Sequence, residues 1–336
     1  MTRSFSPMKV SVLIPTLNRL GYLKESLDSA RRQTHRDLEI LVSDDGSTDG
    51  SQNYARSLEA VDARVRLLPP NPRPGLFNNI NYLAQHASGD AFCILADDDR
   101  LLPEFVEKLA RPLAQDSGLV ASFCDHWLID PTGKTAEEDT EQNTLIYARR
   151  DLPAGEVADA LTQVMKGSMC MGFSLYRSAI FRQELFDLSC GGAADFDYAI
   201  RAAQLGKLYY VKERLGEYRA HAATATATRP GYMIDGIIRV FSKYSFQDAH
   251  HEEMRRRILR SKYGIKALYV CVLDRQEYLR SLREYLKLGG HPLHPKIMVS
   301  FLLAALPRFV AARVKSSIKS AATGSSNRLL RAVMSA

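Results

Sequence analysis

Two clusters of aspartates stand directly after apolar stretches in the first third of the chain. One is the run Asp44-Asp45-Gly46-Ser47-Thr48-Asp49, and the other, Asp97-Asp98-Asp99, follows about 50 residues later. Ligands of open α/β sheets bind outside the carboxyl ends of the parallel strands, so both clusters are expected to face one crevice. Carboxylates gathered there suit a divalent cation and the hydroxyl groups of a nucleotide.

The segments before these clusters have the pattern of buried parallel strands. Val10–Ile14, Leu38–Val42 and Ala91–Leu95 are short apolar runs. Apolar residues at helical spacing separate them, namely Leu20, Leu23, Leu27 and Ala30 and then Phe77, Ile80, Leu83 and Ala84. Strands that alternate with helices predict an α/β fold with a doubly wound, mainly parallel sheet of the Rossmann-like kind.

Six blocks of residues, in order and spacing, resemble glycosyltransferase family 2, whose members have the GT-A fold. They are Pro15–Arg19, Ser43–Asp49, Gly75–Asn81, Leu95–Pro103, Ala194–Arg201 and Tyr218–His221. The last two resemble the family's Glu-Asp-x-Asp helix start and its closing Tyr-Arg-x-His. The resemblance covers about residues 8 to 225 and implies inverting sugar transfer from a nucleotide sugar.

The resemblance also implies a donor site. The residues that match nucleotide-sugar contacts are Pro15, Thr16, Asn18, Arg19, Asp45, Asn79, Asp97 and Arg219. Asp45 matches the position that hydrogen-bonds the base, Asp97 falls near the ribose, and Arg219 would balance the diphosphate charge. Turn and N-cap hydrogen bonding is the alternative for Thr16 and Asn18. For Asn79, the alternative is a place on an exposed helix face. For Arg219, the alternative is packing under the edge of the sheet.

The negative charge of the diphosphate leaving group predicts a metal site. A divalent cation neutralises the diphosphate that departs during sugar transfer, and hard cations prefer oxygen ligands. The resemblance assigns the metal, Mn²⁺ or Mg²⁺, to Asp98 and Asp99, with His221 as an imidazole ligand. Ala96 departs from the family, because it stands where the first acidic residue of the DxD-type motif falls. The alternative is a solvated turn before Pro103, which the mutual repulsion of three carboxylates disfavours.

Inverting transfer needs a carboxylate base to take the proton of the acceptor hydroxyl. Asp195 matches the family's base and follows Gly191-Gly192, whose lack of side chains would leave room for an acceptor. Ala194 replaces the usual glutamate, so Asp197 remains an alternative base. Capping of the helix that begins here is the alternative role of Asp195.

Composition predicts two parts, a catalytic domain over residues 8–228 and a helical basic extension over residues 229–336. Residues 231–336 hold 19 Lys and Arg against 7 Asp and Glu, a net charge of +12, whereas the whole chain carries +7. Residues 1–230 are therefore net −5. The chain shows no zinc-finger or RRM motif, so no nucleic-acid partner is predicted.

Several features predict a cytoplasmic location. The five cysteines form no CxxC pair, which is typical of reduced thiols. The N-terminus shows no apolar signal segment, and the chain has no apolar run of membrane-spanning length. Residues 297–319 join an apolar stretch to Arg313, Lys315 and Lys319, which indicates peripheral contact with an anionic membrane at its inner face. Packing on the domain, or on a second subunit in a homo-oligomer, is the alternative.

Three classes of function fit these features. The first is a metal-dependent inverting glycosyltransferase that acts on a saccharide or lipid-linked acceptor, in synthesis of cell-envelope or surface polysaccharide. The second is a nucleotidyltransferase that makes sugar nucleotides, but Pro15–Arg19 lacks the glycines that a triphosphate loop would need. The third is a non-catalytic nucleotide-sugar-binding relative, which Ala96 permits and the retained Asp98 and Asp195 disfavour.

Overall fold

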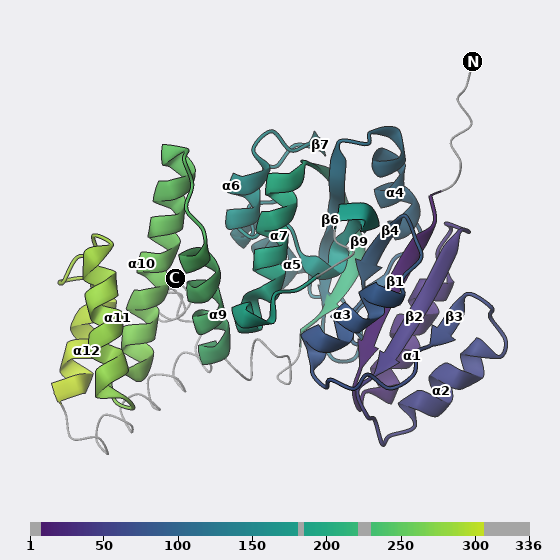
Figure 1. The fold of residues 1–336 in the computed structure, drawn as a ribbon, viewed down its shortest axis with the longest axis horizontal. Helices are drawn as coiled ribbons and strands as arrows, with labels where there is room; N and C mark the ends of the chain where they lie inside the picture. Colours follow the sequence, from purple (N-terminus) through teal and green to yellow (C-terminus); the bar gives the residue numbers. More distant parts are fainter. Residues whose placement is uncertain (1–7, 181–184, 221–229, 306–336) are drawn as a thin grey trace. The chain divides into compact units, whose positions relative to one another are not determined.

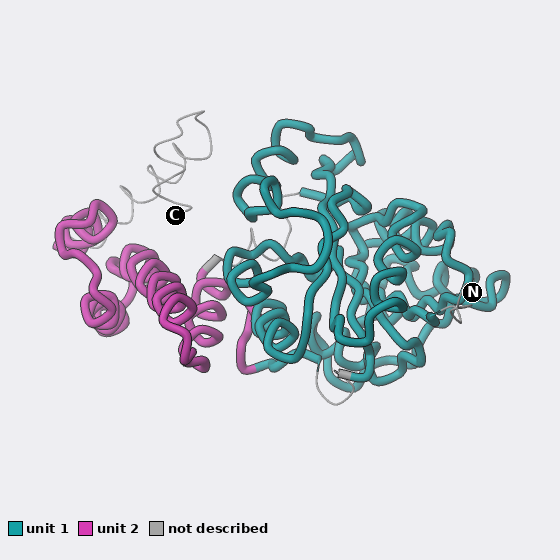
Figure 2. The backbone as a smooth tube through the Cα atoms, turned by 90° about the horizontal axis from the view of Figure 1, so that it is seen from above, with its two compact units in different colours: residues 1–188, 194–224 teal, residues 189–193, 225–336 magenta. Residues whose placement is uncertain are grey.

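The computed structural model describes residues 8–180, 185–220 and 230–305. The predicted metal ligand His221 and residues 306–319 of the predicted membrane segment lie outside the described residues. The chain divides into two compact units (Figure 2). The first comprises Met1–Leu188 and Ala194–Thr224, and the second comprises Ser189–Ala193 and Ala225–Ala336.

The first unit is built on a sheet that has nine strands within the described residues, in the order β3-β2-β1-β4-β8-β6-β9-β5, with β7 beside β9 (Figure 1). Its strands are β1 Val10–Thr16, β2 Leu38–Asp44, β3 Val65–Leu67, β4 Ala91–Ile94, β5 Arg100–Leu101, β6 Leu119–Ile129, β7 Gly155–Glu156, β8 Ser174–Arg177 and β9 Lys207–Arg219. The longer ladders, β1 with β2 and β6 with β9, are parallel. The ladders that β5, β7 and β8 make are short and antiparallel. The predicted mainly parallel α/β sheet is confirmed.

The register of the central strands brings the two acidic clusters to one edge. Thr16 at the end of β1 pairs with Asp44 at the end of β2. On the other side of β1, Leu13 pairs with Ile94 at the end of β4. The chain that leaves β4 therefore reaches Asp97 beside the end of β1.

Helices cover both faces of this sheet. On one face, buried side chains of α1 (Leu20–Arg31), α2 (Ser51–Glu59) and α4 (Phe105–Gln115) form a single core with β1, β2 and β4. On the other face lie α3 (Leu76–His86) and α7 (Ala194–Leu205). Shorter helices complete the unit, namely α5 Glu137–Ile146, α6 Ala160–Met165, η1 Met171–Phe173 and η2 Ser178–Ile180, whereas all of η3 Leu188–Ala193 except Leu188 belongs to the second unit.

A chain of aromatic contacts ties this second face together. Phe92 of β4 and Tyr176 of β8 stack with their ring centroids 5.5 Å apart. Tyr176 meets Tyr198 of α7 edge-on, and Phe186 joins Tyr198 to Phe77 of α3. Their strand neighbours point into the opposite core, as alternation along a strand requires. The sheet is consequently buried on both faces, which is why its strands are almost uniformly apolar.

The second unit consists of α9 (Pro230–Lys243), α10 (Ala249–Val270), α11 (Arg275–Lys287) and α12 (Pro295–Ala305). Two aspartates begin helices as N-caps: Asp248 accepts from the His251 amide at 2.9 Å and Asp274 from the Glu277 amide at 3.0 Å. Buried residues of α10, α11 and α12 form its core. The predicted helical extension is confirmed, and none of the described helices is long and apolar enough to cross a bilayer.

Gly191 and Gly192 belong to this second unit, which differs from the role predicted for them. A Cβ on Gly192 would lie 2.7 Å from the Tyr232 ring of α9, and Gly191 has a φ of +58° that side chains rarely adopt. A Cβ on Gly236 would likewise meet the Cys190 carbonyl oxygen at 2.7 Å. The glycines therefore permit close packing on α9 and leave no open room for an acceptor.

Candidate active site

The end of β1 and the aspartate cluster after β4 are joined by direct hydrogen bonds. Thr16 Oγ1 donates to Asp97 Oδ2 at 2.8 Å, and both residues are buried. Arg19 Nη1 lies 3.1 Å from Asp97 Oδ1 and 2.6 Å from Asp98 Oδ2. Pro15, which precedes Thr16, pairs with Ser43 inside the sheet. The structure thus brings together four of the predicted donor residues with the predicted metal residue Asp98.

Asn18 connects the loops that follow β1 and β2. Its backbone φ is 51°, in the left-handed region that asparagine tolerates. Its amide donates to Ser47 Oγ at 2.7 Å, and its side-chain oxygen accepts from the Thr48 amide at 2.8 Å. Asp49, in the loop after β2, accepts a hydrogen bond from the Leu20 amide at the start of α1, at 2.8 Å. These contacts join two loops that are distant in the sequence, so they differ from the local turn hydrogen bonds that the sequence left open as the alternative.

The two aspartates that end β2 are oriented differently. Asp44 Oδ2 accepts from the amides of Gly46 and Ser47, which holds the turn, while Asp44 Oδ1 is buried without a partner among the described residues. Asp45 is partly exposed, and its Oδ2 accepts from the Gly75 amide at 2.8 Å. Asp45 therefore lies at the rim of the crevice, between the loop after β2 and the start of α3.

Asn79 supports the end of β2 from α3. It is 1% exposed, its Nδ2 donates to the Ser43 carbonyl at 2.9 Å, and its Oδ1 accepts from the Ser43 hydroxyl. Ser43 therefore bonds to both the nitrogen and the oxygen of the Asn79 carboxamide. The predicted contact of Asn79 with a nucleotide sugar does not fit this placement, nor does the alternative of an exposed helix face.

The aspartate cluster concentrates negative charge in a buried place. Asp97, Asp98 and Asp99 are all at most 8% exposed. Burial raises the pKa of Asp97, although the charge of Arg19 and the Thr16 hydroxyl lower it. Burial, followed by the neighbouring charge of Asp98, raises the pKa of Asp99 well above its usual value. The cluster therefore favours an additional cation, and Arg19 between Asp97 and Asp98 shows that positive charge is accepted there.

Arg219 supports the Asp97–Asp99 cluster through hydrogen bonds to Asp98 and Asp99. Its Nε donates to the Asp98 carbonyl at 2.8 Å, its Nη2 to Glu25 at 2.6 Å, and its Nη1 to two backbone carbonyls at 3.1 and 3.3 Å. Its amide donates to Asp99 Oδ1 at 2.9 Å, and its guanidinium lies 4.6 Å from the Tyr22 ring centroid. Because Arg219 is 1% exposed, the predicted contact with a diphosphate does not fit, and packing at the sheet edge does.

Asp195 lies in the first turn of α7. Its Oδ1 accepts from the Phe196 amide at 2.9 Å, and burial raises its pKa to about 6. Burial also raises the pKa of the Cys170 thiol to about 11, and the charges of both Asp99 and Asp195 add to that increase. A Cβ on Gly172 would lie 3.8 Å from Asp99 Oδ2. The loop around Cys170 therefore approaches Asp99, and the charge of Asp195 also acts on it.

Asp197, the alternative base, has another environment. It is fully buried, and its Oδ2 lies 3.0 Å from Nε of Arg201, one turn later on α7. Arg201 also donates to the Leu185 carbonyl. Asp197 therefore anchors α7, whereas Asp195 is the carboxylate of the pair whose charge acts on Cys170.

Two residues around this site, Glu25 and Tyr147, were not predicted from the sequence. Glu25 of α1 lies within 2.6 Å of Arg219 and 3.1 Å of Arg100, and it carries no motif that could reveal this. Tyr147 follows α5 with 41% of its surface exposed. Burial of its hydroxyl raises its pKa, with the charges of Cys170 and Asp195 contributing. The sequence around Tyr147 carries no motif that could have singled it out.

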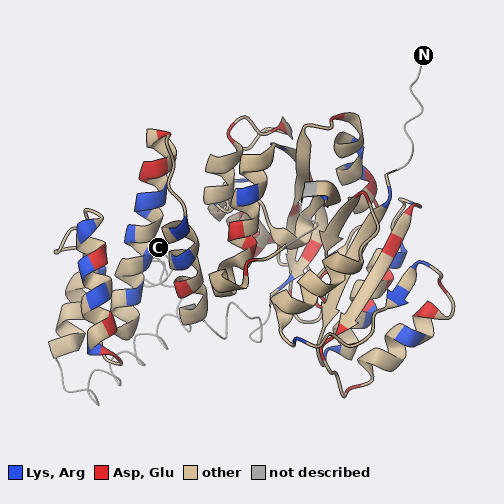
Figure 3. Cartoon of the chain, viewed as in Figure 1, with Lys and Arg blue, Asp and Glu red and all other residues tan. Residues whose placement is uncertain are grey.

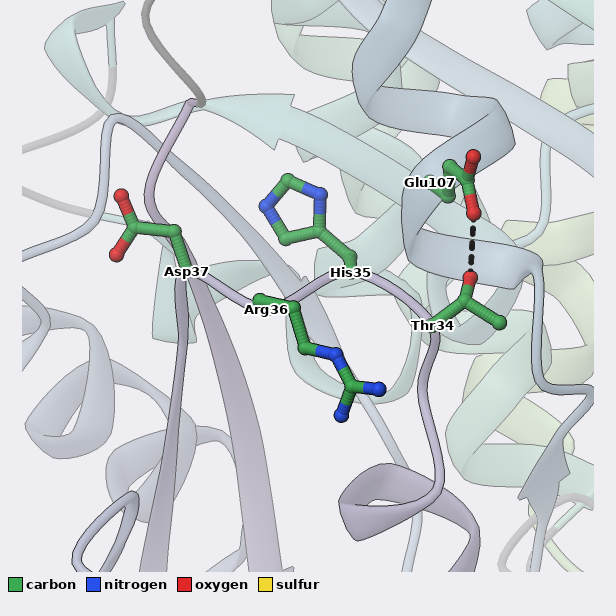
Figure 4. Close-up of a pocket in the computed structure, with 5 residues that line it drawn as sticks. All are labelled: Thr34, His35, Arg36, Asp37 and Glu107. Atoms are coloured by element: carbon green, nitrogen blue, oxygen red, sulfur yellow. Dashed lines mark hydrogen bonds between the residues drawn. The ribbon is translucent and has the colours of Figure 1, made fainter.

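A shallow hollow at the other end of β2 is separate from this site. It is lined by Thr34, His35, Arg36, Asp37 and Glu107, and Thr34 donates a hydrogen bond to Glu107 at 2.5 Å (Figure 4). These residues precede β2 or lie in the first turn of α4. The hollow is therefore at the amino ends of the parallel strands, whereas Asp97, Asp98 and Asp99 lie at the carboxyl ends.

The sheet order and the carboxylates at its carboxyl edge define an α/β enzyme of the GT-A type. Residues 11–183 match the sequence profile described as Glycosyl transferase family 2, which is just over half of the chain. The chain belongs to this family and is a glycosyltransferase.

Individual relatives agree with this assignment. An uncharacterised glycosyltransferase of Rickettsia typhi is 28% identical over 67% of this chain and 68% of its own length. The GalNAc(5)-diNAcBac-PP-undecaprenol beta-1,3-glucosyltransferase of Campylobacter jejuni is 34% identical, over 39% of this chain and 41% of its own.

Solved structures show the same fold. TarS residues 1–349 of S. aureus, in complex with UDP-GlcNAc, superposes with a TM-score of 0.63 at 14% identity, over 92% of each chain. The mannosyltransferase PcManGT of Pyrobaculum calidifontis, in complex with GDP-Man and Mn²⁺, gives a TM-score of 0.60 at 14% identity, over 98% of this chain and 84% of that chain.

Proposed function

We propose that the protein is a metal-dependent, inverting glycosyltransferase that moves a sugar from a nucleoside diphosphate to a hydroxyl of a saccharide or lipid-linked acceptor. One observation carries the proposal: the buried aspartate cluster at the end of β4 and the Asp195 carboxylate of α7, whose pKa is raised to about 6, both act on the Cys170 thiol through their charges. A cluster that attracts cations and a carboxylate of raised pKa then serve one reacting centre.

The donor nucleotide would lie along the carboxyl edge of β1, β2 and β4. Asp45 at the rim is placed to accept a hydrogen bond from the base, and Asp97 with Thr16 lies where a ribose would follow. The loop that contains Asn18 is hydrogen-bonded to Ser47 and Thr48 and would border the nucleotide. Pro15 and Asn79 support the strand ends from inside the protein.

The metal, Mn²⁺ or Mg²⁺, would be held by Asp98, with Asp99 beside it. Carboxylate oxygens are the ligands that hard cations prefer, and the raised pKa of Asp99 indicates that negative charge here lacks compensation. When bound, such a cation neutralises charge on the diphosphate leaving group. The mannosyltransferase relative in complex with GDP-Man and Mn²⁺ supports this choice of metal. His221 stays a proposed ligand outside the described residues.

Asp195 would act as the base. Its carboxylate takes the proton of the acceptor hydroxyl while that oxygen attacks the anomeric carbon from the side opposite the diphosphate. The carbon–oxygen bond to the diphosphate breaks, and the nucleoside diphosphate leaves with the bonding electrons. A pKa of about 6 leaves Asp195 ionised at neutral pH and strengthens it as a base.

The acceptor and its location are proposed from chemistry. The Campylobacter jejuni relative is named for an undecaprenol-diphosphate acceptor, which supports a lipid-linked or polysaccharide acceptor for this chain too. Exposed apolar residues of α12 and the basic excess of the second unit support peripheral contact with an anionic membrane at its cytoplasmic face. Synthesis of a cell-envelope polysaccharide fits both.

A panel of nucleotide sugars tests the proposal. Incubation of the protein with each donor and Mn²⁺ should release a nucleoside diphosphate, slowly with water and faster with an acceptor. A nucleotidyltransferase would instead consume a nucleoside triphosphate and release pyrophosphate. A non-catalytic relative would bind a donor and release nothing.

The stereochemistry of the product tests the inverting mechanism separately. NMR of the glycoside formed from an α-linked donor should show a β-linkage. An α-linked product would contradict the role of Asp195 as a base and would leave the glycosyltransferase assignment in place.

A further inference from the structure

Arg219 is a buried cation that depends on Glu25 of α1 for its counter-charge. Its side chain is fully buried, and its guanidinium donates to the backbone carbonyls of Asp98, Asp130 and Pro131. Within the part of the chain that the structure describes, Glu25 is the carboxylate that this guanidinium contacts, 2.6 Å from Nη2. A desolvated cation that loses its acidic partner is strongly unfavourable. Glu25 therefore decides how the charge of Arg219 acts on its surroundings.

The same arginine holds both of the proposed metal residues. Its Nε donates to the Asp98 carbonyl at 2.8 Å, and its backbone amide donates to Asp99 Oδ1 at 2.9 Å. The first bond fixes the backbone that carries the Asp98 carboxylate, and the second orients the Asp99 carboxylate. Glu25 and the two aspartates thus contact one arginine through different atoms.

Arg100 contacts the same glutamate but has a second acidic partner. Its Nη1 lies 3.1 Å from Glu25 Oε2, and its Nε lies 2.6 Å from Glu217 Oε2. Loss of the Glu25 charge would leave Arg100 paired with Glu217. The same loss would leave Arg219 without a carboxylate at its guanidinium among the described residues.

We propose that Glu25 is a positioning residue for the metal site and acts through Arg219. By neutralising Arg219, it keeps this cation from competing with a metal for the aspartate carboxylates. Without the Glu25 charge, the buried cation would raise the positive potential at Asp98 and Asp99 and weaken binding of a divalent ion. Groups that contact the ligands of a metal commonly tune its affinity. The inference rests on the proposed metal-dependent function.

The first unit carries acidic and basic residues on many of its elements, so loss of any carboxylate there changes the potential at the metal to some degree (Figure 3). Glu217→Gln provides the matched control. It removes the same charge from a residue that is bonded to Arg100 and, among the described contacts, not to Arg219. The side chain of Glu25 is 39% exposed and that of Glu217 is 19% exposed, so neither carboxylate is fully buried.

The test measures Mn²⁺ affinity independently of sugar transfer. Mn²⁺ is titrated into the full chain with UDP present, and in a second series with GDP, while electron paramagnetic resonance reports the free ion. We expect Glu25→Gln to bind Mn²⁺ about tenfold more weakly than wild type. Glu217→Gln should bind Mn²⁺ close to wild type. Equal affinities of Glu25→Gln and Glu217→Gln would overturn the inference.

Glu25→Asp separates a role of charge from a role of size. Glutamine keeps the size of glutamate and loses its charge, whereas aspartate keeps the charge on a shorter side chain. Glu25→Asp should therefore bind Mn²⁺ more tightly than Glu25→Gln. The reverse order, or a Glu25→Gln chain that melts below the temperature of the titration, would assign Glu25 to packing and overturn the inference.

Two results separate the role of Glu25 from the proposed function. Wild type that binds Mn²⁺ with neither nucleotide, or Asp98→Ala that binds it as wild type does, would contradict the proposed metal site and this inference with it. Binding that Asp98→Ala abolishes and Glu25→Gln leaves unchanged would contradict the role of Glu25 alone.

Discussion

Two aspartates in the first turn of α7 occupy opposite environments. Asp195 accepts a hydrogen bond from the Phe196 amide and has a raised pKa, whereas Asp197 is fully buried and pairs with Arg201. We predict that Asp195→Asn keeps donor binding but lowers transfer by about 10²–10⁴-fold, because the amide cannot take a proton. Steady-state rates with a fixed donor measure this.

Asp197→Asn is the matched control for that variant. It removes an ion pair from a buried site, so it should lower the melting temperature, and the transfer rate of the folded fraction should change far less. If Asp197→Asn proves to be the catalytically crippled variant while Asp195→Asn transfers normally, the base has been assigned to the wrong residue.

The raised pKa of Asp195 also predicts pH dependence. Because the carboxylate must be ionised to act, kcat should fall as pH drops through about 6. The folded state holds the Asp195 proton more tightly than the unfolded state, so ionisation of Asp195 lowers stability as pH rises from about 4 to 6. Asp195→Asn should therefore melt higher than wild type at pH 7, and the difference should vanish below about pH 4. A flat kcat profile between pH 5 and 8 would contradict this account.

At the scale of elements, β9 passes η1 with no space for a side chain. A Cβ on Gly216 of β9 would lie 2.1 Å from the ring of Phe173, which is fully buried. We predict that Gly216→Ala lowers the free energy of unfolding of the first unit by about 1–3 kcal/mol, through overpacking. The urea midpoint, followed by far-ultraviolet circular dichroism, measures it.

Gly21 of α1 provides the matched control for Gly216. An added Cβ there meets no atom within 4 Å, so Gly21→Ala should raise stability by about 0.4–1 kcal/mol through reduced freedom of the unfolded chain. If both alanines shift the urea midpoint alike, the close contact between Gly216 and Phe173 is absent from the protein in solution.

The elements that sequence could predict are those with a strong periodic pattern. β1, β2 and β4 are short apolar runs, and parallel pairing follows from the helices between them, which places Thr16, Asp45 and Asp97 at one edge. The antiparallel β8, which inserts between β4 and β6, carries no such signal, because pairing partners depend on the whole sheet. The role of Asn79 was missed for a related reason, because only the folded chain brings it near Ser43, whereas packing of Arg219 at the sheet edge was one of the two roles that the sequence left open.

At the scale of the whole molecule, an acidic first part is joined to a basic second part. Exposed charges are screened within about 10 Å at 0.1 M salt and about 3 Å at 1 M. We predict that binding of the full chain to anionic vesicles weakens over this range, and that exposed apolar residues such as Phe301 and Leu302 leave some binding at high salt. Sedimentation measures it, and a chain that dimerises without binding vesicles would favour the subunit-packing alternative.

The central claim is that the aspartates at the end of β4 hold a metal that joins the donor to the protein. Thermal unfolding with a nucleoside diphosphate, with and without Mn²⁺, tests it most directly, because a ligand that binds only the folded state raises stability. Wild type and Asp195→Asn should gain stability only when nucleotide and Mn²⁺ are both present, and Asp98→Ala should lose that gain while keeping its own fold. Equal stabilisation of Asp98→Ala by the nucleotide and Mn²⁺ would contradict the claim.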